Sequence, residues 1–277
     1  MSISPYFFFD PVHYRDAGVA HNDEFVSNDP FPHVVIDNFL PEWVIDRVID
    51  ETKARREGDW ENYEDRQQKH RFISEAHGTM GPFSQHLLSE FNSAAACTFI
   101  EELTGIKGIV PDPYLQGGGL HSMKSGGTLK VHVDFNRQKR IDLARRVNLL
   151  VYLNRDWQPE WNGDLELWNG DMSQAVKKIA PVANRCVVFA TSTTSFHGVP
   201  KILACPPDRS RDVIGLYYYT NHQVDFDDGD EHNTLWQERP EDNRPPGVKK
   251  LLEAGDRARQ LSRRAKSLAG RAIRRVL

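Results

Sequence analysis

The amino-acid sequence predicts a mainly β protein with flanking α-helices, built as a sandwich or a barrel. Between residues 110 and 220, short runs typical of β-strands recur, and Gly, Pro, Asn and Asp separate them. Such turn signals favour a sandwich or barrel over a parallel α/β sheet. The chain has 277 residues, of which 39% are hydrophobic and 10% aromatic. This composition is enough for a hydrophobic core and is unlike that of a disordered chain.

The N-terminal region, residues 1–109, is expected to pack on that β core as one strand and two helices. The run FPHVVIDNFL at 31–40 indicates a short strand, and the proline at 41 is typical of a first helical turn. The segment PEWVIDRVIDETKARRE then places apolar residues at helical spacing. A second helix is expected from about 82 to 104, with Gly105 as its C-cap.

Residues 57–80 separate these two helices and show no clear periodicity. They contain Trp60, Tyr63 and His77 among many charged residues. Long loops in compact domains are often functional. We therefore interpret this segment as a long loop and a candidate lid over a substrate, with an ordinary solvated loop as the alternative.

The predicted catalytic core is the β region at 110–220. Behind it, 221–246 is acidic and then Pro-containing, which indicates a linker. Its strands are expected at 112–123, 127–135, 145–153, 164–168, 176–180, 185–190 and 212–220.

The last segment, 247–277, is expected to form a basic amphipathic helix. It holds ten Lys/Arg against two acidic residues, although the whole chain has a net charge of −4. Its apolar residues form one helical stripe. The helix could lie on an anionic membrane surface, hold an acidic partner, or pack on the domain with its charges in water. The sequence leaves the oligomeric state open.

Composition also indicates the cellular compartment of the protein. Three scattered cysteines form neither a disulfide framework nor a CxxC metal site, and they fit a reducing cytosol. The first residues, MSISPYFFFDPVHYRD, resemble neither a signal peptide nor a membrane span. We expect a cytoplasmic protein. Nucleic acid is not an expected partner, because the basic segment has no interleaved aromatic residues and the main domain is acidic.

The most informative stretch is LKVHVDFN at 129–136. In a strand, side chains two apart share a face. One side of the strand would thus carry Leu129, Val131, Val133 and Phe135, and the other Lys130, His132 and Asp134. Burying a carboxylate is unfavourable unless something pairs with it. Either this face meets water, or a cation lies there.

A third candidate ligand lies downstream, where His197 follows the apolar run NRCVVFAT. Two imidazoles and one carboxylate can form a facial triad that leaves half of an octahedral metal open, as suits non-haem Fe(II). A zinc hydrolase could use the same ligand types, but HExxH is missing. It would also leave the arginine-led strand RSRDVIGLYYYT without a role.

That strand offers a partner for an anionic co-substrate, because the planar guanidinium can make two charge-assisted bonds to a carboxylate. We choose Arg211, which would share a face with Val213 and Tyr217; Arg209 has the same parity and is the rival. On RRVNLLVYLN, Tyr152 would share a face with Asn148 and could add its hydroxyl. Asn148 could orient a ligand or merely pair with backbone, and the backbone pairing is favoured. For His121, upstream, packing and substrate contact are both open.

Taken together, HVDFN, RRVNLLVYLNRDW, NGDLELW, NRCVVFATSTTSFHG and RSRDVIGLYYYT resemble the Fe(II)/2-oxoglutarate oxygenases of the prolyl-4-hydroxylase-like superfamily. The resemblance implies a double-stranded β-helix, or jelly roll. It implies Fe(II), 2-oxoglutarate and O2 as cofactors, and hydroxylation of a C–H bond with release of succinate and CO2. His132, Asp134 and His197 would be the catalytic metal ligands, and Arg211 and Tyr152 would bind 2-oxoglutarate.

One residue departs from the pattern, because many relatives carry a hydroxyl residue where this chain has Val213. By this resemblance, the co-substrate would lose one hydrogen bond there. The substrate itself, a prolyl residue, an amino acid, a sugar or another small molecule, is not readable from the motifs. The alternative to an enzyme is an inactive jelly roll that binds a metal.

Overall fold

The structure is a computed structural model of the whole chain, and it describes residues 7–55, 57–74, 79–221 and 231–242. The chain divides into two units, Met1–Gln237 and Glu238–Leu277. Of the second unit, only 238–242 are described. The predicted basic helix at 247–277 lies outside the described residues, as does part of the predicted linker at 221–246.

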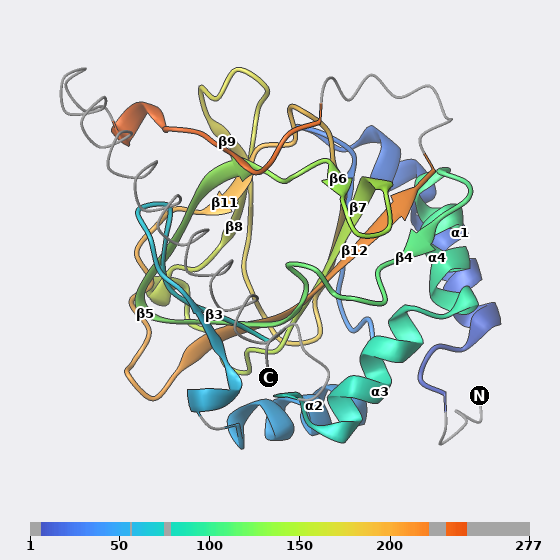
Figure 1. Cartoon of the computed structure of the whole chain (residues 1–277), viewed down its shortest axis with the longest axis horizontal. Helices are drawn as coiled ribbons and strands as arrows, with labels where there is room; N and C mark the ends of the chain where they lie inside the picture. The colour runs from blue at the N-terminus through green and yellow to red at the C-terminus, as the bar shows by residue number, and fades with distance from the viewer. Residues whose placement is uncertain (1–6, 56, 75–78, 222–230, 243–277) are drawn as a thin grey trace, which may run out of the picture. The chain divides into compact units, whose positions relative to one another are not determined.

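One antiparallel sheet dominates the first unit and curls on itself (Figure 1). Its main path is β1-β10-β7-β12-β5-β11-β8-β9. Strand β5 (Gly119–Val133) joins the two halves of the curl, because its first half pairs with β12 and its second half with β11. A single strand thus replaces the two predicted at 112–123 and 127–135.

The elements have the following bounds. The helices are α1 (Pro11–Ser27), α2 (Glu42–Lys53), α3 (Pro82–Phe91) and α4 (Ala94–Thr104), with 3₁₀ turns at Glu57–Asp59, Pro159–Trp161 and Pro240–Asp242. Besides β5, the strands are β1 (His33–Ile36), β2 (Glu61–Tyr63), β3 (Gln68–Ser74), β4 (Val110–Pro111), β6 (Arg137–Gln138), β7 (Leu143–Tyr152), β8 (Leu165–Trp168), β9 (Ala175–Ile179), β10 (Cys186–Ala190), β11 (His197–Val199), β12 (Ser210–Thr220) and β13 (Leu235–Trp236).

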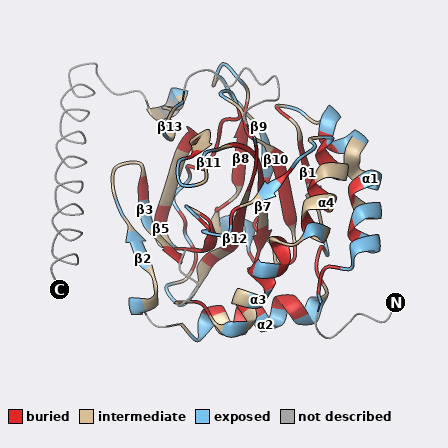
Figure 2. Cartoon of the chain, turned by 45° about the vertical axis from the view of Figure 1, so that its right-hand side comes forward, coloured by how far each residue is buried: buried red, intermediate tan, exposed pale blue. Residues whose placement is uncertain are grey.

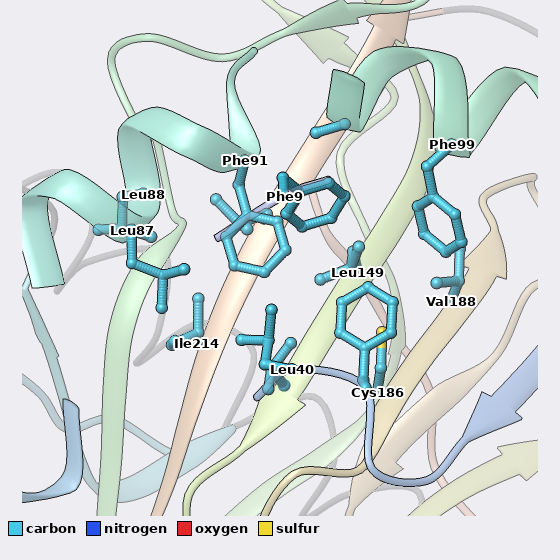
Figure 3. Packing of buried hydrophobic residues seen from close by; sticks show 14 of the residues in the cluster. Phe9, Leu40, Leu87, Leu88, Phe91, Phe99, Leu149, Cys186, Val188 and Ile214 are labelled. Carbon is cyan, nitrogen blue, oxygen red and sulfur yellow. The ribbon is translucent and has the colours of Figure 1, made fainter. Parts of the chain in front are cut away.

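The main hydrophobic core lies between the helices and one face of the sheet. In Figure 3, Phe9, Phe91 and Phe99 pack against the strand residues Leu149 and Val188. The helices turn buried residues toward the sheet and exposed ones outward (Figure 2). Each fully buried side chain of this kind contributes about 1.5–3 kcal/mol. Because strand side chains alternate, the opposite face of the same strands is left to line the inside of the curl.

The predicted helices agree with the observed ones apart from two differences. Gly105 ends α4 in the left-handed conformation (φ 72°), as predicted. The predicted single helix at 82–104 is two helices, because Ser93 accepts a hydrogen bond from the Ala96 N–H and starts a new helix. Helix α1 was not predicted, since its apolar residues have no helical period. Asp10 caps it and Pro11 opens it.

The interpretation of 57–80 as a long loop is wrong. Strands β2 and β3 form an antiparallel hairpin there, and β3 also pairs with β5. The segment therefore extends the sheet at the open side of the curl. Of its aromatic residues, Tyr63 lies on β2 and Trp60 packs against the main core, whereas His77 lies outside the described residues. Within the described residues, no helix combines the length and the apolar character needed to cross a membrane.

Candidate metal centre

Three side chains meet inside the curled sheet. His132 lies near the end of β5, Asp134 directly follows that strand, and His197 begins β11. In the register of the two strands, His197 pairs directly with His132. Residues opposite each other in an antiparallel pair are close neighbours, and the two ring centroids are 4.5 Å apart. Antiparallel pairing thus brings together two histidines that are far apart in the sequence.

The donor atoms of these residues converge. The Nε2 atoms of His132 and His197 lie 3.5 and 3.4 Å from the two carboxylate oxygens of Asp134. One ligand atom from each of the three residues falls within 4.8 Å of the others. No other such group of His, Cys, Asp and Glu occurs among the described residues. The arrangement can hold one metal ion.

Backbone carbonyls set the orientation of both imidazoles. Nδ1 of His132 donates to the carbonyl of Lys130 at 2.8 Å, and Nδ1 of His197 donates to that of Ser195 at 2.9 Å. A carbonyl only accepts, so the proton lies on Nδ1 and the Nε2 lone pair faces Asp134. Burial, with the neighbouring His197, lowers the pKa of His132, which favours the neutral imidazole. Metal-binding histidines commonly have such partners, so the donor set fits a divalent cation.

Asp134 has two further partners that the sequence did not point to. Arg145 places its guanidinium 3.0 Å from the Asp134 carboxylate, and Asn148 donates to it at 2.7 Å. Burial opposes ionisation of Asp134, yet the Arg145 guanidinium holds its pKa well below the usual range. Asn148 therefore contacts a candidate metal ligand, and the favoured reading of a simple backbone pairing is wrong.

The Arg145 side chain is fixed in place by hydrogen bonds and by two aromatic rings. It donates from Nε and a terminal nitrogen to Asn148 Oδ1, at 2.9 and 2.7 Å. Its guanidinium lies over the rings of Tyr217 and Phe135. The alternation of β7 alone would turn Arg145 away from Asn148. An extra residue, Arg146, sits between the pairs Tyr218–Val147 and Tyr219–Arg145, and this bulge returns Arg145 to the inner face.

The three candidate ligands lie in a cavity of about 480 Å³. This volume is in the range of small-molecule sites, roughly 300–1,000 Å³. Arg211 lines the same cavity, as do Val213 and Tyr217 on its strand, which agrees with the predicted shared face. Arg209 precedes the strand, points to the carbonyl of Arg155 and does not line this cavity.

Arg211 is oriented by two contacts. Its Nε donates to the carbonyl of Gly163 at 2.7 Å, and a terminal nitrogen donates to the Tyr152 hydroxyl at 3.2 Å. The Tyr152 side chain is fully buried. Burial raises the pKa of Tyr152, so its hydroxyl stays protonated. The two residues that the sequence paired as an anion site therefore touch each other.

The strand parity predicted for LKVHVDFN is correct for His132, Val131 and Val133 but wrong for Leu129 and Phe135. Leu129 and, beyond the end of the strand, Phe135 line the cavity with His132, whereas Val131 and Val133 pack on the other side with Trp168. A register shift in the β5–β11 pairing, between His197 and Val199, breaks the alternation.

Other cavity residues come from segments that the sequence had left open. His121 lines it, as do Tyr63, Gln68 and Arg71 of the β2–β3 hairpin. From the far end of the unit, the Trp236 ring lies 4.9 Å from that of His132.

Comparisons with known proteins agree with this site. Residues 118–219 match the family model of the 2OG-Fe(II) oxygenase superfamily. Over 80 residues, the chain is 32% identical to prolyl 3-hydroxylase OGFOD1 of Mus musculus. This alignment covers 27% of the chain and 14% of the mouse protein, so the chain matches a small part of that relative's length. The predicted cofactors, Fe(II), 2-oxoglutarate and O2, are those of the matched family and are confirmed by it.

Solved structures confirm the jelly-roll fold. A Trichoplax adhaerens prolyl hydroxylase, in complex with a hypoxia inducible factor peptide fragment, has a TM-score of 0.56 at 19% identity, over 75% of this chain and 91% of that one. A Pseudomonas putida prolyl-4-hydroxylase has a TM-score of 0.51 at 20% identity, over 74% and 99%. HygX from Streptomyces hygroscopicus, with nickel and 2-oxoglutarate bound, has a TM-score of 0.50 at 11% identity, over 78% and 96%.

Proposed function

Because residues 118–219 of this chain belong to the 2OG-Fe(II) oxygenase superfamily, we propose that the protein is a dioxygenase that hydroxylates an unactivated C–H bond of its substrate and releases succinate and CO2. The observation that carries the proposal is the convergence of two Nε2 atoms and one carboxylate in the cavity that Arg211 also lines. Fold likeness alone would not support an activity.

Each part of the cavity has a role in this proposal. His132, Asp134 and His197 hold Fe(II), which, with 2-oxoglutarate and O2, supplies the oxidising chemistry. Arg211 and Tyr152 bind the far carboxylate of 2-oxoglutarate. Arg145, with Asn148, keeps Asp134 ionised and oriented. The apolar residues that share the lining, Leu150, Leu165, Phe189, Val199 and Val213, limit the access of water to the reacting atoms.

The substrate belongs to the proposal as well: a peptide or a small molecule that carries the C–H bond inside this cavity. Support comes from the Trichoplax adhaerens neighbour, whose structure holds a peptide fragment. A prolyl residue, an amino acid and a sugar each remain candidates.

The test needs no substrate. Under anaerobic conditions, Fe(II) and then 2-oxoglutarate are added to metal-free protein, and the visible charge-transfer band of a chelated keto acid is recorded. We expect a saturable band that is lost in His132→Ala and kept in His13→Ala, which removes an exposed histidine of α1. A folded wild-type protein that binds iron but shows no band would contradict the proposal. It would favour an inactive binding module, or a zinc hydrolase indifferent to 2-oxoglutarate.

A further inference from the structure

The β2–β3 hairpin brings a third arginine, Arg71, into the cavity that Arg145 and Arg211 also line. Gln68 and Arg71 of β3 both line it, although residues three apart in a regular strand point to opposite faces. The β3–β5 pairing shifts register between Lys69 and Arg71, and His70 takes a left-handed φ of 49° there. This irregularity turns both side chains inward.

Arg71 has neutral partners only. One terminal nitrogen donates to Gln68 Oε1 at 2.7 Å, and the other donates to His121 Nδ1 at 2.9 Å. Within the part of the chain that the structure describes, no carboxylate forms an ion pair with it. Burial lowers the pKa of Arg71, but an arginine stays charged in proteins. Gln68 and His121 therefore orient the guanidinium without neutralising it.

Each of the other charged side chains of the cavity has a partner, either in the protein or in the proposed function. Asp134 is paired with Arg145. In the proposed function, Arg211 takes the far carboxylate of 2-oxoglutarate, and the metal takes the near one. Arg71 then keeps a positive charge beside the substrate space. The Arg71 side chain is only half-buried, but a charge that is partly removed from water with no counter-ion is unfavourable, and a bound anion would relieve it.

We propose that Arg71 is a specificity-determining residue that selects a substrate carrying a carboxylate. This inference rests on the proposed function, because it assigns the remaining anion sites to 2-oxoglutarate. Two of the five guanidinium N–H donors are used within the protein, so donors remain for a planar carboxylate. The carboxylate belongs either to a free amino acid or to an acidic side chain next to the target residue of a peptide.

The experiment uses acetate as the probe and neutral acetamide, of the same shape, as its control. Each is titrated into protein loaded with Fe(II) and 2-oxoglutarate without O2. Tryptophan fluorescence reports occupancy, because Trp236 lines the cavity. The keto-acid band reports in the same sample that 2-oxoglutarate stays bound. Loss of that band in the wild type would fault the proposed function, whereas the difference between acetate and acetamide tests Arg71.

We expect a saturable response to acetate and at least about a tenfold weaker one to acetamide, since one charge-assisted contact is worth that much. Arg71→Gln should remove the difference and Arg71→Lys should keep part of it. Lys69→Gln, an exposed position on the same strand, should behave as wild type. A preference for acetate that persists in Arg71→Gln would overturn the proposal. So would an acetate response that displaces 2-oxoglutarate, or equal responses to both probes.

Two further arms separate the sources of the carboxylate. Proline is compared with prolinamide, and an end-capped Pro-Glu peptide is compared with its Pro-Gln counterpart. Succinate formation that Arg71→Gln reduces only for the acid member identifies which carboxylate Arg71 binds. Equal stimulation by acid and amide members in the wild type would contradict a carboxylate substrate.

Discussion

Arg145 and Asp134 form an ion pair in the lining of the cavity, with 3.0 Å between a terminal nitrogen of Arg145 and Oδ2 of Asp134. The Arg145 side chain is 1% exposed. The pair explains how a carboxylate stays ionised in a site lined by apolar side chains. Removing one partner of such a pair leaves an uncompensated charge, which typically destabilises the folded protein by about 3–5 kcal/mol. A metal bound by Asp134 would supply part of the missing positive charge.

The first prediction follows from this pair. Arg145→Gln should lower the stability of the metal-free protein by about 3 kcal/mol, and Fe(II) or Mn(II) should restore part of it. Metal affinity should fall by roughly 10- to 100-fold, as for other residues that orient a ligand. Denaturant unfolding with and without metal measures both effects. Equal destabilisation in the two states would show that Arg145 has only a structural role.

A second prediction separates the two arginines of the β12 region. Arg211→Gln should raise the KM for 2-oxoglutarate by about tenfold or more, because it removes a charged donor. Arg209→Gln should leave that KM unchanged, since Arg209 lies outside the cavity. Uncoupled succinate formation measures this. The reverse result would move the co-substrate to Arg209.

Tyr152→Phe provides a third prediction. It removes the hydroxyl that accepts from Arg211 and keeps the buried ring. The KM for 2-oxoglutarate should rise about tenfold or more, the value of one hydrogen bond to a charged group, and the midpoint of thermal unfolding should change little. A large loss of stability with an unchanged KM would assign Tyr152 to the core alone.

A fourth prediction concerns the strand contact that pairs the histidines. A Cβ at Gly198 would lie 2.9 Å from the backbone of Lys130 and Val131 on β5. Moving backbone atoms of a paired strand is energetically unfavourable. Gly198→Ala should therefore displace His197 and weaken metal binding at least about tenfold. Gly170→Ala meets nothing closer than 3.9 Å and is the matched control. Metal titration followed by unfolding distinguishes loss of the site from loss of the fold.

A fifth prediction is a pH effect on stability far from the site. The Arg185 hydrogen bond lowers the pKa of Asp37 on the surface. The depressed pKa means that this contribution is present above the unfolded pKa of about 3.9 and disappears as pH falls through the folded value. Asp37→Asn should destabilise by only ~0.5 kcal/mol at pH 7, because the carboxylate is more than half exposed. At a pH below this depressed folded pKa, the variant and the wild type should have the same midpoint of denaturant unfolding.

Several features were readable from the sequence because they depend on residue types and local periodicity. The regular parts of β7 and β12 alternate as expected. Asn148 and Arg211 therefore face the cavity, while Leu149 and Ile214 join the helix-side core. The helix signals of α2 and the αL glycine at 105 also depend on neighbours in the chain.

The hairpin at 61–74 is a different case. Its residues have weak strand propensity of their own and become a strand because β5 offers a partner. β-propensity reflects such partners more than an intrinsic preference. For that reason the local pattern of this segment favours a loop and does not indicate that Arg71 lines the cavity.

The order of the motifs and the face of each regular strand follow from the local sequence alone. The exceptions depend on tertiary contacts, and three register shifts illustrate them: they turn Leu129 beside His132, Arg145 beside Asn148, and Arg71 beside Gln68. An odd number of extra residues opposite a partner strand reverses the face of the side chains beyond them. Strand pairing is a contact between segments distant in the sequence, so no local pattern records where that residue will fall.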